Sequence, residues 1–152
     1  MEYNQWLRDR IAERGQSGAC GPASWSEVAK VANTRALGRR GERIACRALK
    51  AMGYVVVEKN FTCSEGEIDI VATKDGYLCF IEVKSRSSAE FGLPEEAITA
   101  WKKRKLYRVA TSFLERHQGS DAADLRFDIA CVDLRTEKVR VISNAFDFEA
   151  DL

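Results

Sequence analysis

Hydrophobic and polar positions recur along the chain with two periods, one typical of helices and one typical of strands. From residue 34 onward, apolar residues return at helical spacing among arginines and lysines, and Gly53 supplies a stop signal. A second helical pattern starts at Pro94, a residue that suits the first position of a helix. It continues through a basic middle to about His117. The pattern therefore predicts two long amphipathic helices.

Five strands are predicted around these helices, because the segments concerned are rich in β-branched and aromatic residues. They cover residues 54–57, 68–73, 77–84, 125–134 and 138–143. The dipeptide Asp75-Gly76 separates the second strand from the third, and such a dipeptide between two apolar runs is a strong hairpin signal. The predicted order is helix, three strands, helix, two strands, which indicates an α/β fold.

The first 34 residues carry a weaker pattern. Apolar residues at helical spacing, including Trp6 and Ile11, predict a short helix near the start of the chain, and residues 25–33 predict another. A Gly- and Ser-rich stretch that contains Pro22 indicates a linker between them. We therefore expect an N-terminal extension over residues 1–34, a main domain over residues 35–148 and a short tail over residues 149–152.

Composition narrows the class of protein. Of the 152 residues, 45% are hydrophobic, which is enough for one packed domain. The chain lacks an apolar run of about 18 residues and its start lacks the order of a signal peptide, so we expect no membrane span and a cytoplasmic location. The five cysteines form no Cys-x-x-Cys pair, which argues against a metal finger and suits a reducing compartment.

The net charge of +1 hides a segregation of charge along the chain. Residues 35–50 hold six basic residues and one acidic residue, and residues 99–117 hold the same numbers. Between them, residues 51–98 hold nine acidic and four basic residues. Two basic segments thus flank an acidic middle, a distribution that suits phosphate contacts on either side of a cation site.

The predicted hairpin brings charged residues together. With a two-residue loop at Asp75-Gly76, Asp69 lies opposite Glu82 and Glu67 lies opposite Lys84, all on one face near its open end. Two carboxylates about 4 Å apart repel by roughly 4 kcal/mol at an effective dielectric of about 20, so one interpretation is a Mg²⁺ site between them. The other is a solvated polar face with an ion pair between Glu67 and Lys84. The opposite face, expected to be core, carries Ile68, Ile70, Cys79, Ile81 and Val83.

The same residues carry a resemblance to a known family. Asp69 followed by Ile81-Glu82-Val83-Lys84 is similar to the split D…(D/E)-x-K signature of the restriction-endonuclease-like superfamily. Within it, the chain resembles the bacterial YraN-type family and is similar to archaeal Holliday-junction resolvases. The resemblance implies a restriction-endonuclease-like core of αβββαβ order, with helices flanking a mixed central sheet. Its motifs include Gly38-Arg39-Arg40-Gly41-Glu42, Gly66-Glu67-Ile68-Asp69, Asn60-Phe61, Pro94-Glu95-Glu96-Ala97 and Arg126-Phe127-Asp128.

The resemblance also implies roles for individual residues. Asp69 and Glu82 would hold a divalent metal, Mg²⁺ or in its place Mn²⁺. Lys84 would position or help to deprotonate the attacking water and stabilise the charge that builds on phosphorus. Glu42 corresponds to a glutamate that lies near the metal in the resolvase relatives.

Three residues keep two interpretations each. Glu42 either lies near the metal or is an exposed ion-pair partner for Arg39 or Arg43. Lys102 lies on the apolar stripe of the second long helix, where it either serves the site or extends to the rim. On the same helix, Lys103, Arg104 and Arg108 are expected to point outward. Trp101 is expected to be a packing residue rather than a platform for stacking a base. The candidate nucleic-acid contacts are Arg39, Arg40, Arg43, Arg86, Lys102, Lys103, Arg104 and Lys105.

Three functions follow from these features. The leading hypothesis is a metal-dependent endonuclease-like protein that hydrolyses phosphodiester bonds of DNA, with branched or damaged DNA as candidate substrates. The second is a nucleic-acid-binding or adaptor protein that keeps the nuclease fold without turnover. The third is an interaction module in which residues 1–33 dock on a partner. A homodimer is compatible with each of them, and the sequence does not define the oligomeric state.

Overall fold

The computed structural model describes residues 25–87, 98–117 and 124–146. The chain divides into two compact units, Met1–Asn33 and Thr34–Leu152, and the fold and the site below belong to the second unit. The predictions for the start of the chain and for the C-terminal tail fall outside the described residues, and so does Pro94.

The elements follow the predicted order of helix, three strands, helix and two strands. They are α2 (Trp25–Ala51), β1 (Val55–Cys63), β2 (Gly66–Lys74), β3 (Tyr77–Arg86), α3 (Ala100–Arg116), β4 (Asp124–Asp133) and β5 (Val139–Phe146). The prediction of a separate helix over 25–33 is wrong, because α2 runs unbroken through this region. No glycine or proline interrupts the chain between residues 25 and 37, so nothing in the backbone ends the helix there.

The second long helix begins later than predicted. Ile98 and Thr99 are not helical, and the Thr99 hydroxyl accepts a hydrogen bond from the Lys102 backbone N–H at 3.2 Å. Thr99 is therefore the N-cap of α3, which starts at Ala100 rather than at Pro94. None of the helices in the described part of the chain has the length and hydropathy that crossing a membrane requires.

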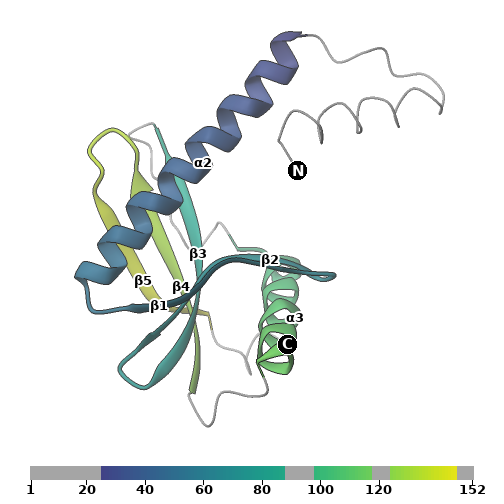
Figure 1. Cartoon of the computed structure of the whole chain (residues 1–152), viewed down its shortest axis with the longest axis vertical. Helices are drawn as coiled ribbons and strands as arrows, with labels where there is room; N and C mark the ends of the chain where they lie inside the picture. Colours follow the sequence, from purple (N-terminus) through teal and green to yellow (C-terminus); the bar gives the residue numbers. More distant parts are fainter. Residues whose placement is uncertain (1–24, 88–97, 118–123, 147–152) are drawn as a thin grey trace, which may run out of the picture. The chain divides into compact units, whose positions relative to one another are not determined.

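The five strands form one mixed sheet in the order β1-β2-β3-β4-β5, in which β3 and β4 are parallel and the other pairs are antiparallel. The prediction of a mixed central sheet flanked by helices is confirmed. Adjacent residues Phe80 and Ile81 belong to different hydrophobic clusters, one built on α3 and the other on α2. Since successive strand residues point to opposite faces, the two helices cover opposite faces of the sheet (Figure 1).

The hairpin between β2 and β3 has the predicted turn and register. Asp75 and Gly76 both have positive φ angles, of 51° and 82°, as a two-residue hairpin turn of type I′ requires. The register pairs Lys74 with Tyr77 and continues to Ile70 opposite Ile81, where the ladder ends. Asp69 and Glu82, the next pair in this register, therefore lie where the two strands separate.

The outer hairpin of β1 and β2 twists at Asp69, which the sequence pattern does not predict. Phe61 pairs with Ile68 and Lys59 pairs with Ile70, and the residue between Phe61 and Lys59 is Asn60, which has a φ of 54°. Ile68 and Ile70 consequently pack in different clusters, so the prediction that both lie on one core face is wrong. In Figure 1 the far ends of β1 and β2 curve toward α3.

Two buried contacts fix the elements that carry the site. A Cβ at Gly41 would lie 1.7 Å from the Ser85 Oγ, so glycine is what allows α2 to approach β3 this closely. On β4, Asp128 is only 1% exposed and accepts two hydrogen bonds from Arg126 at 2.9 Å each. The Tyr54 hydroxyl also donates to this carboxylate at 2.9 Å. The buried carboxylate of Asp128 therefore has hydrogen-bond donors for both of its oxygens, and through Tyr54 it connects β4 to the start of β1. The sequence alone does not reveal this role.

Candidate carboxylate site

Asp69 lies at the point where β2 leaves β3, and its carboxylate turns back toward the partner strand. The Val83 backbone N–H donates a hydrogen bond to Asp69 Oδ2 at 2.7 Å. Burial and the negative charges of Glu82, Glu42 and Glu67 together raise the pKa of Asp69 to about 7, against the lowering effect of the Val83 hydrogen bond. The predicted meeting of Asp69 and Glu82 is therefore confirmed, and Glu42 and Glu67 lie close enough to act on the same carboxyl group.

Glu82 is buried at 8% exposure and has two cations beside it. Lys84 Nζ and Lys102 Nζ each lie 3.0 Å from its Oε1. The alternative ion pair between Lys84 and Glu67 is not formed, because Lys84 contacts Glu82 on its own strand. Lys102 reaches the same carboxylate from α3. Of its two interpretations, this contact favours the one in which Lys102 serves the site.

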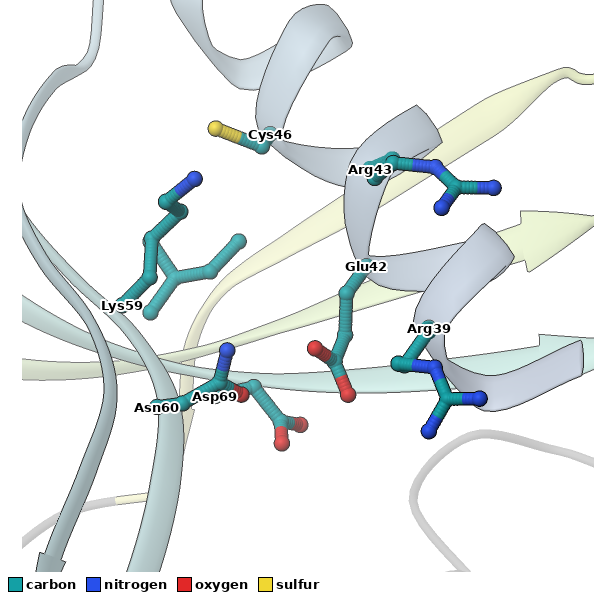
Figure 2. Close-up of a pocket in the computed structure, with 8 residues that line it drawn as sticks. Arg39, Glu42, Arg43, Cys46, Lys59, Asn60 and Asp69 are labelled. Atoms are coloured by element: carbon teal, nitrogen blue, oxygen red, sulfur yellow. The ribbon is translucent and has the colours of Figure 1, made fainter. Parts of the chain in front are cut away.

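A pocket of about 210 Å³ opens between α2 and the β1–β2 hairpin next to Asp69. Figure 2 shows the carboxylates of Glu42 and Asp69 directed toward the same space, while the guanidinium groups of Arg39 and Arg43 point away from it. Among the described residues Glu42 forms no ion pair with either arginine, so the interpretation of Glu42 as their ion-pair partner is wrong. The pocket is lined by Arg39, Glu42, Arg43, Cys46, Lys59, Asn60, Asp69 and Ile70.

The oxygen donors at this point fit a hard divalent cation. Asp69 and Glu42 have no cation paired with them within the described ranges, and their shared negative charge is what a bound metal would relieve. The part of the chain that the structure describes contains no group of three His, Cys, Asp or Glu side chains already arranged as metal ligands. Two carboxylates are sufficient where water and phosphate oxygens complete the shell, as is usual for Mg²⁺.

The predicted nucleic-acid contacts do not form one surface. Arg39 and Arg43 lie at the pocket, whereas Arg40 forms an exposed ion pair with Glu137 at 3.1 Å. Arg86 is exposed at the end of β3. The remaining candidates lie on α3, which covers the other face of the sheet.

On α3 the predicted orientations hold for some side chains only. Arg104 is exposed as predicted. Lys103 is half-buried with its amine 5.6 Å from the centre of the Phe146 ring, so the prediction that it points outward is wrong. Trp101 is 64% exposed, so its interpretation as a packing residue is also wrong. The reason is its place on the helix, one residue before Lys102 and outside the buried stripe of Leu106, Val109, Ala110 and Phe113.

Four pocket residues were not among the predicted site residues, and one of them, Ile70, was predicted as core. Lys59 and Asn60 come from β1, which the sequence pattern ends at residue 57, and Cys46 comes from α2. A signal for Asn60 was available, because asparagine tolerates the left-handed backbone better than other residues with a side chain. For Lys59 and Cys46 the sequence offers no such signal.

Comparison with known proteins adds the following. The sequence model of "Uncharacterised protein family UPF0102" matches residues 41–132. A UPF0102 protein of Caldicellulosiruptor saccharolyticus is 42% identical over 118 residues, which cover 75% of this chain and 99% of the relative. Similar proteins occur in Lachnoclostridium phytofermentans, at 41% identity over 76% of this chain and 96% of the relative, and in Alkaliphilus metalliredigens, at 41% over 74% and 99%.

Proposed function

Because this chain belongs to the UPF0102 family, as its YraN-type motifs predicted, and that family's name states no activity, we propose its function from the site itself. We propose that the protein is a metal-dependent endonuclease of restriction-endonuclease-like fold that hydrolyses phosphodiester bonds of DNA. The observation that carries the proposal is the meeting of Asp69 and Glu82 where β2 and β3 separate, with Lys84 bound to Glu82. The order of elements and the mixed sheet support the fold assignment.

Asp69 and Glu82 are the residues that would hold the metal, with Glu42 beside them. A divalent cation at this position supplies a Lewis acid that polarises the phosphate and lowers the pKa of a bound water. Lys84, already 3.0 Å from Glu82, places a positive charge where negative charge on a phosphate develops. The Val83 backbone N–H holds one Asp69 oxygen in place and leaves the other available.

The charges around the carboxylates suit a polyanionic substrate. Lys59 lines the pocket beside Asp69 and can bind a phosphate next to the scissile bond, and the outward-pointing guanidinium groups of Arg39 and Arg43 (Figure 2) can bind phosphates farther along the strand. The cysteines in the described part of the chain are free thiols, which fits the cytoplasmic location that we expect for a protein acting on DNA.

The test is cleavage of labelled single-stranded, duplex, flap and four-way DNA with Mg²⁺ or Mn²⁺. We expect cleavage of at least one of these by the natural protein, and its loss in Asp69→Asn and Lys84→Ala. Asp75→Asn is the matched control for the acid, since Asn-Gly is a favoured type I′ turn, and Lys138→Ala on the exposed surface is the control for the lysine. No cleavage of any substrate, or cleavage unchanged in Asp69→Asn, would overturn the proposal.

One observation favours the second candidate, a nucleic-acid-binding protein without turnover. Both Lys84 and Lys102 contact the same oxygen of Glu82, and two lysines can neutralise this carboxylate without a metal. A protein of this kind binds DNA with a salt-dependent affinity and shows no Mn²⁺ binding in a titration. Mn²⁺ binding that Asp69→Asn abolishes would exclude it.

A further inference from the structure

One side of α3 carries four residues that the carboxylate site does not use. Trp101, Arg104, Lys105 and Arg108 are spaced by three and four positions, so they lie on one side of the helix over two turns. We call this set the α3 stripe. It is separate from the positions of α3 that pack in the core, and three of its members are exposed.

Trp101 is the most unusual member of the α3 stripe. Its exposure of 64% is well above that of Tyr77 at 37% and of Tyr107 at 36%, which are the other exposed aromatic residues in the described part of the chain. An exposed indole in a basic surrounding leaves a flat apolar face available to a ligand. The Lys105 amine lies 5.3 Å from the centre of this ring and places a cation against it.

We propose that the α3 stripe binds single-stranded nucleic acid, with an unpaired base stacked on Trp101 and the flanking phosphates held by Arg104, Lys105 and Arg108. Every base has a π-face, so an aromatic side chain among basic residues recognises unpaired strands with little regard to sequence. A base inside a duplex is already stacked on its neighbours and does not reach Trp101. The stripe therefore selects DNA that has an unpaired segment.

The charges of the stripe favour a nucleic acid over a protein partner. Arg104 forms no ion pair with any residue that the structure describes, and it is fully available to a phosphate. Arg108 lies 3.6 Å from Glu65, but both side chains are exposed, at 68% and 42%, and such a pair contributes little. Arg108 can therefore leave Glu65 and bind a phosphate with little loss of stability.

The stripe begins next to the carboxylate site. Lys102, the residue after Trp101, reaches across to Glu82 at 3.0 Å. A strand whose base stacks on Trp101 therefore binds to the same turn of α3 that contacts the carboxylate of Glu82. In this respect the inference rests on the proposed function, and it names the substrate class as DNA with a single-stranded region.

The experiment measures binding in EDTA, so that it does not depend on the metal or on cleavage. The probes are a labelled oligothymidine of about 15 nucleotides and a duplex of the same length. We expect Trp101→Ala to weaken oligothymidine binding about tenfold and Trp101→Phe to retain most of it. Duplex binding should stay unchanged in both variants, and Met52→Ala, which removes another exposed apolar side chain, should behave as the natural protein.

The salt dependence separates stacking from phosphate contact. The logarithm of the affinity falls as the logarithm of the salt concentration rises. Arg104→Ala and Arg108→Ala should each make this slope shallower by about 0.7, and Trp101→Ala should leave it unchanged. Arg135→Ala, an exposed arginine in the β4–β5 turn, serves as the control. Equal oligothymidine affinity of Trp101→Ala and the natural protein would overturn the inference, and so would an equal loss for the duplex.

The two proposals can fail separately. If Asp69→Asn keeps full cleavage while Trp101→Ala loses oligothymidine binding, the carboxylate site is wrong and the α3 stripe stands. If Asp69→Asn abolishes cleavage while Trp101→Ala binds oligothymidine normally, the site stands and the stripe is wrong.

Discussion

Replacement of Asp69 by asparagine should stabilise the protein when no metal is added. The carboxyl has a pKa of about 7 in the folded chain, against an unperturbed value of 3.8, because it is buried beside Glu82 and other acids. Its ionised form therefore disfavours the fold. Asparagine removes this charge and keeps an oxygen that can accept the Val83 N–H hydrogen bond.

The magnitude follows from the two pKa values. The folded state binds the proton more tightly than the unfolded state, so the destabilisation is complete above pH 7, shrinks as the pH falls and vanishes below the unfolded value. A difference of about three pKa units corresponds to a destabilisation of the folded state by at most about 4 kcal/mol at pH 8 and about 2 kcal/mol at pH 5. Solvent around the half-buried carboxyl reduces both figures, and we expect a gain of about 1–3 kcal/mol at pH 8.

Urea unfolding in EDTA at pH 8 and pH 5 measures this gain. Asp75→Asn, at an exposed turn position, makes the same chemical change without the acidic surroundings and should shift the free energy of unfolding by less than about 0.5 kcal/mol. The reasoning is refuted if Asp69→Asn is less stable than the natural protein at pH 8. A gain that is the same at both pH values also contradicts it.

Substitutions at three further positions test how the fold positions the site, each by urea unfolding. Gly41→Ala should lose about 1–3 kcal/mol, since its Cβ meets Ser85; stability equal to the natural protein would mean that α2 shifts freely. Asp128→Ala should lose about 3–5 kcal/mol because the Arg126 guanidinium, 13% exposed, is left without its partner; a loss below about 1 kcal/mol would show that the pair is dispensable. Asn60→Val should lose about 1–2 kcal/mol at a φ of 54°, whereas Asn60→Gly should be nearly neutral, and equal losses would exclude backbone strain as the cause.

The parts of the fold that depend on local chemistry could be predicted from the sequence. A two-residue Asp75-Gly76 turn determines the register of its hairpin, and the register determines that Asp69 meets Glu82. Helical spacing alone placed Lys102 on the inner side of α3, where it contacts Glu82. Each of these relations joins residues that a single turn or a single helix fixes relative to each other.

The parts that depend on tertiary contacts could not be predicted. Lys84 has acids on its own strand and on the neighbouring one, and which of them it contacts depends on where the strands separate. The twist at Asn60 places Ile68 and Ile70 in different clusters and breaks the period of two on which the core assignment relied. The role of Asp128 could not be predicted because its partner Tyr54 is 74 residues away in the sequence.

The central claim is that Asp69 and Glu82 share a divalent cation, and anomalous scattering from crystals soaked in Mn²⁺ tests it most directly. The account predicts a manganese peak bound by both carboxylates, and no peak at this position in Asp69→Asn crystals. A soaked crystal in which Glu82 keeps Lys84 and Lys102 as its partners, with no manganese beside Asp69, would contradict it.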